Sequence, residues 1–209
     1  MLACNATAAA PAAHGAWDDG ALVVLDACVL MSGIVRPLLL RLAAGGRFRP
    51  VWSLRIGQEW RRNAARIWQV EPALLEAQWQ AMQEAFPLAD CGDTQPWETG
   101  LRYSDPKDWH VIAAARAAQA RAPGAPACVL TWNLKDFNRS ELRRLGLAVL
   151  DPDRLLAGWW TRHQALLRHA LAGTQADSLA LGRDAQPLAA ILHRERLYRL
   201  SKLVDAAAA

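Results

Sequence analysis

Short, unbroken apolar runs separated by helix-like segments are the feature that most restricts the fold of this chain. Residues 21–25, Ala-Leu-Val-Val-Leu, form such a run, which is typical of a central strand buried on both faces of a sheet. Further strands are predicted at residues 50–52, 127–131 and 147–150. Strands that alternate with helices of about 10 to 15 residues predict an α/β sandwich around a mostly parallel sheet.

Breaker and capping residues mark the helices between these strands. Helices are predicted at residues 37–44, from the cap Ser53 through Trp68, and at about 72–87, 105–122 and 137–145. After residue 152 no strand is indicated, and two helical segments at about 153–171 and 186–204 each carry an apolar stripe. We therefore expect a loose N-terminal leader (1–20), an α/β domain (21–152) and a C-terminal helical hairpin (153–209).

The apolar residues of the C-terminal segment exceed one narrow stripe, because the neighbours Trp159 and Trp160 point in two directions. This excess predicts an interface, either with a second copy in a homodimer or with a segment of a partner protein. Complete packing within the chain is the alternative.

Composition excludes several protein classes. Hydrophobic residues make up 53% and charged residues 21% of the 209-residue chain, a balance typical of a folded protein. The longest nearly apolar stretch, residues 21–35, contains Asp26 and is shorter than the run of about 20 residues that a membrane span needs. No Lys or Arg precedes Arg36, so the sequence lacks the positive start of a secretory signal, and we expect a cytoplasmic protein. The four cysteines form no Cys-x-x-Cys pair, which argues against a zinc–thiolate site and a redox dithiol.

Five acidic residues fall at strand ends or on helices, and each has a structural explanation when taken singly. Asp26 follows the first strand, where ligands bind in open α/β sheets but where turn residues are also common. Glu59 has arginines nearby in its helix, Asp105 and Asp108 make a well-formed helix start, and Asp136 could cap the helix that follows it. Together, however, a sheet would bring these acids to one edge, and oxygen-only clusters select cations such as Mg²⁺ or Mn²⁺. Converging carboxylates also need a compensating cation.

Four segments resemble successive motifs of the PIN domain, and in particular the branch that contains VapC-type toxins of bacterial toxin–antitoxin modules. These segments are Val24-Leu-Asp26-Ala-Cys-Val-Leu30, Glu59-Trp-Arg-Arg-Asn63, Asp105-Pro-Lys-Asp108-Trp-His-Val-Ile-Ala-Ala-Ala115 and Val129-Leu-Thr131-Trp-Asn133-Leu-Lys-Asp136-Phe137. The resemblance covers about residues 22–156, and the motifs occur in the expected order and spacing. It implies a three-layer α/β/α sandwich.

The resemblance also implies a metal-dependent endoribonuclease and assigns roles to individual residues. It implies a Mg²⁺ or Mn²⁺ site formed by four acids, Asp26, Glu59, Asp108 and Asp136. Asn133 stands where many members have Asp, and its carbonyl can bind a cation or accept a hydrogen bond from the attacking water. Thr131 is expected to support the site through its hydroxyl group, and Asp105 is kept mainly as a helix cap. The implied partners are an RNA substrate and a cognate antitoxin protein.

Charge is unevenly distributed along the sequence. The net charge is +4, but residues 36–66 hold eight arginines and the single acid Glu59, whereas residues 67–108 hold eight acids and two basic residues. Arg55, Arg62 and Arg66 lie near one face of the predicted helix, because steps of seven and four residues approximate whole turns. This face is predicted to bind the RNA backbone, with a solvated, arginine-rich helix face as the commoner alternative.

Aromatic and histidine residues adjoin the proposed site. Trp60, Trp109 and Trp132 each neighbour a proposed site residue, so we expect some of them to border the cleft, although tryptophan is more often buried. His110, two residues past Asp108 on a helix, is expected to point to another face and to be structural.

Other functional classes fit the sequence less well. A haloacid-dehalogenase-like phosphatase needs a second Asp two residues after the first, where this chain has Cys28. A phospho-receiver domain is disfavoured because Glu59 and Asp108 fall on predicted helices. Ser-His-Asp pairings, a P-loop and a Gly-x-Gly-x-x-Gly motif are absent from the sequence. The remaining alternative is a catalytically inactive PIN-fold module that binds RNA or protein, and metal-dependent RNA cleavage would separate it from the enzyme.

Overall fold

The computed structural model describes residue 17 and residues 20–207, so the predicted leader lies outside the described residues except for Trp17 and Gly20. Four strands form one parallel sheet in the order β2-β1-β3-β4. Their bounds are Leu22–Leu25 (β1), Arg49–Val51 (β2), Ala127–Leu130 (β3) and Leu147–Leu150 (β4). All residues of the central strands β1 and β3 are buried, as the unbroken apolar runs predict.

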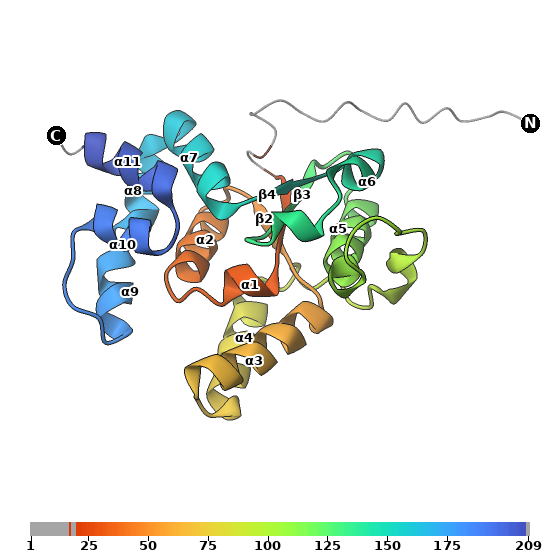
Figure 1. Cartoon of the computed structure of the whole chain (residues 1–209), viewed down its shortest axis with the longest axis horizontal. Coiled ribbons are helices and arrows are strands. Elements are labelled where there is room, and N and C mark those ends of the chain that lie inside the picture. The colour runs from red at the N-terminus through yellow and green to blue at the C-terminus, as the bar shows by residue number, and fades with distance from the viewer. Residues whose placement is uncertain (1–16, 18–19, 208–209) are drawn as a thin grey trace, which may run out of the picture.

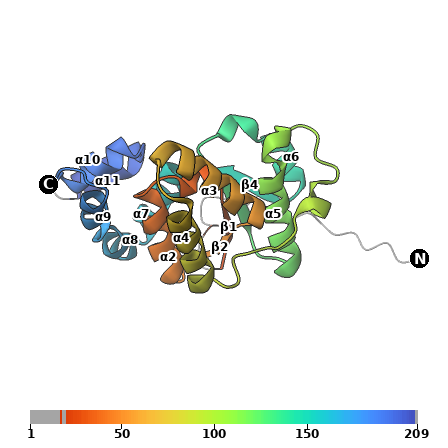
Figure 2. The same ribbon diagram turned by 90° about the horizontal axis from the view of Figure 1, so that it is seen from below.

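Helices cover the sheet on both sides, which confirms the predicted three-layer α/β/α sandwich. Figure 1 shows α2 (Val35–Ala44) on one side of the sheet and α5 (Trp109–Arg121) on the other. Helix α5 packs directly against β1 and β3. Helices α3 (Leu54–Trp68) and α4 (Pro72–Ala85) pack together, and α3 contacts the short helix α1 (Ala27–Leu30), which follows β1. Figure 2 views the molecule from the side on which these helices lie.

Local capping explains several of the helix boundaries. Ser53 caps α3 by accepting a hydrogen bond from the N–H of Ile56 at 3.3 Å, as predicted. The helix predicted at 105–122 begins with a 3₁₀ turn, η2 (Pro106–Asp108), and becomes α-helical only at Trp109. Two further 3₁₀ turns, η1 (Gln95–Glu98) and η3 (Leu134–Asp136), were not predicted.

The capping role considered for Asp136 is wrong. Helix α6 begins at Arg139 and ends at Arg144, and its cap is Asn138, which accepts a hydrogen bond from the N–H of Glu141 at 2.9 Å. Asp136 instead ends the turn η3, which separates it from α6. The structure therefore removes the simplest structural reason for an acid at this position.

The C-terminal region is helical, as predicted, but the two expected segments are interrupted. Five helices follow β4: Pro152–Arg162 (α7), Gln164–Leu171 (α8), Thr174–Ala180 (α9), Leu188–Arg194 (α10) and Tyr198–Ala206 (α11). The interruptions have a backbone cause, because His163 leaves the helical region with φ −137° and ψ 45° and Arg196 is left-handed with φ 65°. Asp153 joins α7 to α11 by accepting hydrogen bonds from the N–H groups of Arg199 and Leu200.

The interface of this region was predicted because Trp159 and Trp160 were not expected to be buried together, but both are buried. Trp159 and Trp160 are 0% and 5% exposed, and the Trp159 ring stacks on Phe48 with a centroid distance of 5.5 Å. Leu192, Leu197 and Leu200 are also fully buried. Most of the apolar stripes therefore pack within the chain, while Leu179, Leu181 and Tyr198 of the same region remain exposed. No helix in the described part of the chain is long and apolar enough to cross a bilayer.

Candidate functional site

Asp26 lies at the carboxyl end of β1 and is only 3% exposed. Its Oδ2 accepts hydrogen bonds from Thr131 Oγ1 at 2.6 Å and from Cys28 Sγ at 3.1 Å. The contact with Thr131 follows from strand register, because Leu25 pairs with Leu130 in the parallel ladder. The next residues of both strands, Asp26 and Thr131, therefore lie side by side.

A small hydrogen-bond network fixes the loop that follows β3. Thr131 Oγ1 accepts a hydrogen bond from the N–H of Asn133 at 3.0 Å, and Cys28 Sγ accepts one from the N–H of Trp132 at 3.3 Å. The sequence reasoning missed Cys28 as a partner of Asp26, although its position two residues after Asp26 is a usable signal. The Asn133 side chain is exposed and forms no hydrogen bond with the residues that the structure describes, so its amide is available to a ligand.

Two 3₁₀ turns bring Asp108 and Asp136 to the same edge. The N–H of Asp105 donates to the carbonyl oxygen of Asp136 at 2.8 Å, which joins the start of η2 to the end of η3. The Asp105 side chain caps η2 by accepting a hydrogen bond from the N–H of Lys107 at 3.0 Å, as expected. Asp108 and Asp136 end these turns and are both partly exposed.

The loop that leads into η2 is held by a buried carboxylate. Glu141 of α6 accepts hydrogen bonds from the N–H groups of Arg102, Tyr103 and Ser104 at 2.7, 3.1 and 2.9 Å, and from Ser104 Oγ at 2.7 Å. Burial by itself would raise the pKa of Glu141, but these hydrogen bonds hold the pKa below its ordinary value. Glu141 thereby positions the segment that carries Asp108.

The expectation that His110 points away from the acids is wrong. His110 is 2% exposed, and its Nε2 lies 3.2 Å from Glu59 Oε2 of α3, an ion-pair contact without good hydrogen-bond alignment. Its Nδ1 lies 2.8 Å from the carbonyl oxygen of Lys107. The helical-spacing argument fails because Asp108 belongs to the 3₁₀ turn, whereas His110 belongs to α5. Glu59 thus contacts His110, whereas the sequence suggested that its partner is an arginine of the helix that carries Glu59.

The four predicted acids influence one another electrostatically. Burial raises the pKa of Asp108 to about 6, and the negative charges of Asp26, Asp136 and Glu59 act in the same direction. Burial also raises the pKa of Asp26, against the effect of hydrogen bonds from Thr131 and Cys28. The contact with His110 lowers the pKa of Glu59, and the charges of Arg62 and Arg55 lower it further. The charges of Asp26, Asp136 and Glu59 are therefore close enough to raise the pKa of Asp108, the fourth acid that the motifs pointed to.

The donor set fits a hard divalent cation, although the acids do not form a closed ligand group. All four acids offer carboxylate oxygens, and none of Asp26, Asp108 and Asp136 pairs with a Lys or Arg of the described residues. Within the same residues, no three His, Cys, Asp or Glu side chains are grouped as metal ligands. Positive groups therefore contact or lie near Glu59, whereas Asp26, Asp108 and Asp136 have no Lys or Arg partner among the described residues.

The arginine-rich run does not form a single basic face. Arg36 is largely buried, which lowers its pKa to about 10, and its guanidinium lies 4.9 Å from the centroid of the Trp60 ring. Arg41 forms an ion pair with Asp177 at 2.6 Å. These arginines attach neighbouring elements to one another, because each reaches across to another helix or its aromatic side chain.

The three arginines predicted to bind RNA are exposed on α3. Arg62 and Arg66 form no ion pair with a described residue, whereas Arg55 pairs with Glu98 at 2.8 Å and remains 53% exposed. Trp60 is fully buried and does not border a cleft, in contrast to the partly exposed Trp109 and Trp132. The exposed positive charge beside Glu59 is therefore limited to one face of α3.

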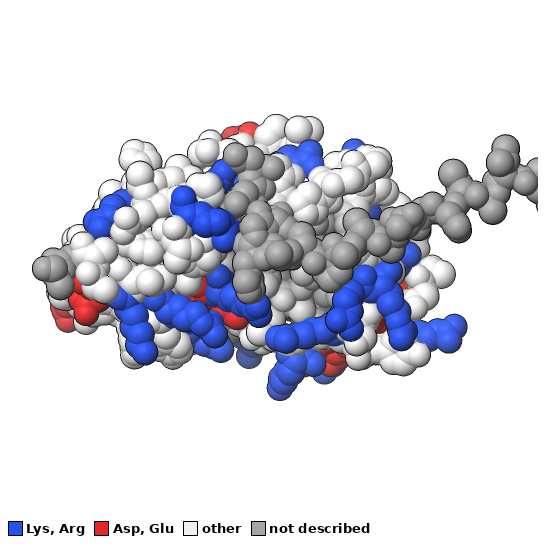
Figure 3. Space-filling view, turned by 90° about the horizontal axis from the view of Figure 1, so that it is seen from above, with Lys and Arg blue, Asp and Glu red and all other residues white. Residues whose placement is uncertain are grey.

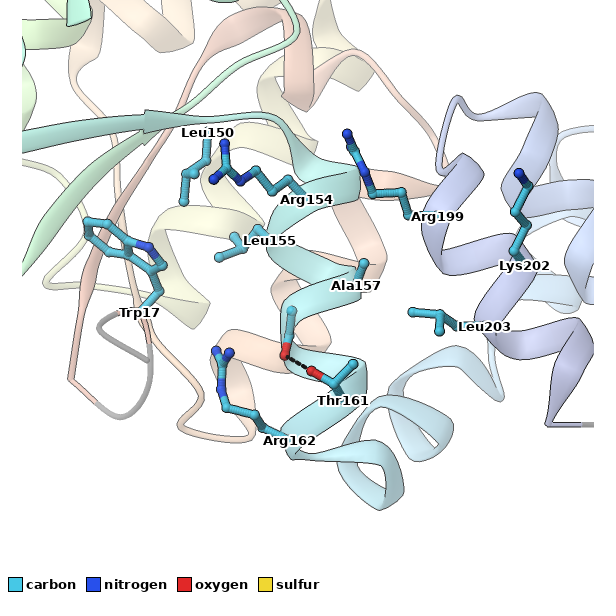
Figure 4. Close-up of a pocket in the computed structure, with 11 residues that line it drawn as sticks. Trp17, Leu150, Arg154, Leu155, Ala157, Thr161, Arg162, Arg199, Lys202 and Leu203 are labelled. Carbon is cyan, nitrogen blue, oxygen red and sulfur yellow. Dashed lines mark hydrogen bonds between the residues drawn. The ribbon is translucent and has the colours of Figure 1, made fainter. Parts of the chain in front are cut away.

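Positive charge and pockets also occur away from the acids. Figure 3 shows another face of the molecule, where Lys and Arg side chains gather along one border. Helices α7 and α11 line a pocket of about 560 Å³ with an apolar floor and a basic rim (Figure 4). The rim side chains are Arg154, Arg162, Arg199 and Lys202. A second pocket, of about 590 Å³, lies beside β2, and neither pocket is lined by the four acids.

Fold and site together define a three-layer α/β/α domain with a cluster of acids at the carboxyl edge of a parallel sheet. The PIN domain family matches residues 22–135, more than half of the chain, and the chain belongs to this family. PIN domains are generally nucleases, and PIN nucleases generally use divalent metal ions. No curated protein and no solved structure matches the chain.

Proposed function

We propose that the chain is a Mg²⁺- or Mn²⁺-dependent endoribonuclease that acts as the toxin of a toxin–antitoxin module, as VapC-type proteins do. The observation that supports this most is the pKa of Asp108, which burial and the charges of Asp26, Asp136 and Glu59 raise to about 6. A protein gains no stability from such a cluster, because like charges oppose one another. A bound divalent cation would offset this repulsion, and this favours a metal site among these acids.

The chain's own residues prepare this site in distinct ways. Thr131 and Cys28 both donate to Oδ2 of Asp26, which orients the carboxylate and leaves Oδ1 free of hydrogen bonds with the described residues. His110 Nε2 lies 3.2 Å from Glu59 Oε2. The exposed amide of Asn133 can orient a water for attack on phosphorus. When bound, a divalent cation supplies Lewis acidity that activates the water and offsets charge on the phosphate.

The RNA backbone needs positive charge to approach the acids. Arg62 and the paired Arg55 on α3 supply it near Glu59, and Arg66 is exposed further along the same helix. The proposal includes a cognate antitoxin protein and a cytoplasmic location, since the implied substrate is cellular RNA. A homodimer through α7 has no support, because Trp159 and Trp160 are buried.

The test is RNA cleavage by the purified chain with Mg²⁺, with Mn²⁺ and with excess EDTA. We expect cleavage only with the metals, products with 5′-phosphate and 3′-hydroxyl ends, and no activity in Asp26→Asn purified in parallel. Circular dichroism of Asp26→Asn checks that the fold survives. Equal cleavage in EDTA would contradict the metal mechanism, and RNA binding without cleavage would favour the inactive binding module.

A further inference from the structure

The turn between α10 and α11 reaches the edge of the acidic site. The guanidinium carbon of Arg196 lies 4.9 Å from the centroid of the Trp132 ring. Trp132 follows Thr131, the hydrogen-bond partner of Asp26, and its N–H donates to Cys28. A residue of the C-terminal helices, outside the matched range 22–135, is therefore adjacent to the loop that carries Asn133.

This turn is held in place from several sides. Arg196 adopts φ 65°, a left-handed conformation that is uncommon for residues other than glycine, and its N–H bonds to the last turn of α10. The next residue, Leu197, is fully buried. The preceding residue, Glu195, accepts hydrogen bonds from Ser32 Oγ at 2.6 Å and from Arg183 Nη1 at 2.8 Å. Because Ser32 lies just beyond α1, the turn is fastened to the same edge of the sheet as Asp26.

The Arg196 guanidinium is available to an anion. It is exposed and forms no hydrogen bond or ion pair with any described residue, whereas Arg183 and Arg199 of the same region contact acids. The face of a tryptophan and a planar guanidinium are both surfaces on which a nucleobase stacks. A nucleotide beside the acids would need both features, one for its base and one for its phosphate.

We propose that Arg196 and Trp132 form a binding site for one unpaired nucleotide next to the phosphate that is cut. The base stacks on the exposed face of the Arg196 guanidinium, whose other face covers the Trp132 ring, and the guanidinium N–H groups contact the adjoining phosphate. A base inside a duplex cannot stack there, so the C-terminal helices give the site a preference for unpaired RNA. This inference rests on the proposed RNA cleavage, and it assigns a substrate-binding role to the C-terminal helices.

The decisive variant is Arg196→Gly, because glycine adopts φ 65° without strain and removes the whole side chain. Loss of binding in this variant therefore cannot be attributed to a strained backbone. Arg168→Ala is the matched control, since Arg168 lies 5.3 Å from the Trp160 ring in another arginine–tryptophan contact of the C-terminal helices. Arg196→Lys retains the charge but loses the planar stacking surface.

Binding is measured in the Asp26→Asn background by fluorescence anisotropy, with a single-stranded RNA and a blunt RNA duplex over a range of salt concentrations. We expect Arg196→Gly to reduce the slope of log affinity against log salt by about 0.7 for the single strand. This corresponds to about fivefold weaker binding at 0.1 M salt. Arg196→Lys should retain the slope but bind the single strand more weakly. Arg196→Gly should keep its affinity for the duplex and its melting temperature. Arg168→Ala should bind the single strand as tightly as the unsubstituted protein.

An unchanged single-strand affinity and slope in Arg196→Gly, with a lower melting temperature, would overturn the proposal and show a purely structural contact. An equal loss for the single strand and the duplex would also overturn it. Because binding is measured without cleavage, a wild-type chain that fails to cut RNA contradicts the proposed function without altering this result. Conversely, a wild-type chain that cuts RNA and an Arg196→Gly variant with unchanged KM contradict only the present inference.

Discussion

Replacing Asp108 by asparagine should stabilise the metal-free protein. In the folded chain the pKa of Asp108 is raised from 3.8 to about 6, first by burial and then by the charges of three other acids. One pH unit of difference corresponds to about 1.4 kcal/mol, which sets an upper bound of about 3 kcal/mol on the charge penalty. The side chain is partly exposed, so solvent screening lowers the expected gain to about 1 to 2 kcal/mol.

The gain should depend on pH in a defined direction. Between the two pKa values the folded protein binds more protons at this site than the unfolded chain, so wild-type stability falls as the pH rises from about 4 to about 6. Asp108→Asn lacks this dependence. The stabilisation should therefore be complete above about pH 7, where both states of the wild type are ionised, and should vanish below about pH 4.

The assay is urea unfolding in EDTA at several pH values between 4 and 8, with Asp105→Asn as the control. Asp105 caps η2, and asparagine caps a helix start about as well as aspartate, so this control should stay within about 0.5 kcal/mol of the wild type. Added Mg²⁺ should stabilise the wild type more than Asp108→Asn. A destabilised Asp108→Asn at pH 8, or a gain of equal size at pH 4, would refute the electrostatic reasoning.

Three further predictions concern the loop, the core and the basic face. Glu141→Gln should lower the free energy of unfolding in urea by about 2 to 4 kcal/mol, because four hydrogen bonds to a carboxylate are weakened. The pKa of Glu141 is lowered in the folded chain, so this loss of stability is full above pH 4.5 and shrinks as the pH falls. Gly57→Ala should lower stability by about 1 to 3 kcal/mol, since a methyl group there overlaps the indole of Trp79. Gly158→Ala is the control: the nearest atom that its methyl group would meet, on Arg162, lies 3.7 Å away, so this variant should be neutral or stabilising in the same measurement. Arg62→Ala should reduce the slope of log affinity against log salt for single-stranded RNA by about 0.7. An unchanged slope would show that the arginines of α3 face solvent and do not bind RNA.

Residues of the candidate site differ in how far they could be predicted. Asp26 could be placed because the apolar run 22–25 is a strand by local pattern, and an acid at its carboxyl end lies at the edge of the sheet. Asp105 could be recognised as a cap from its position before Pro106. The contact of His110 with Glu59 could not be predicted, since it depends on a 3₁₀ turn and on the packing of α5 against α3.

The arginines show the same distinction. Their number along residues 36–66 is plain in the sequence, but Arg36 is covered by the Trp60 ring and Arg41 by Asp177. Whether an arginine faces solvent or another element depends on partners that are distant along the chain. Composition alone therefore overstated the basic face.

The sequence by itself determined the alternation of strands and helices, the capped start of α3 after Ser53 and the acids proposed for the site, because these depend on apolar pattern and capping within a few residues. Only the tertiary structure decided the strand order β2-β1-β3-β4, the division of the C-terminal region into five helices and the placement of Arg196 beside Trp132. The physical reason is that such contacts are selected by the packing of the whole chain. A left-handed residue at position 196 is tolerated because burial of Leu197 and the bonds of Glu195 over-determine the turn.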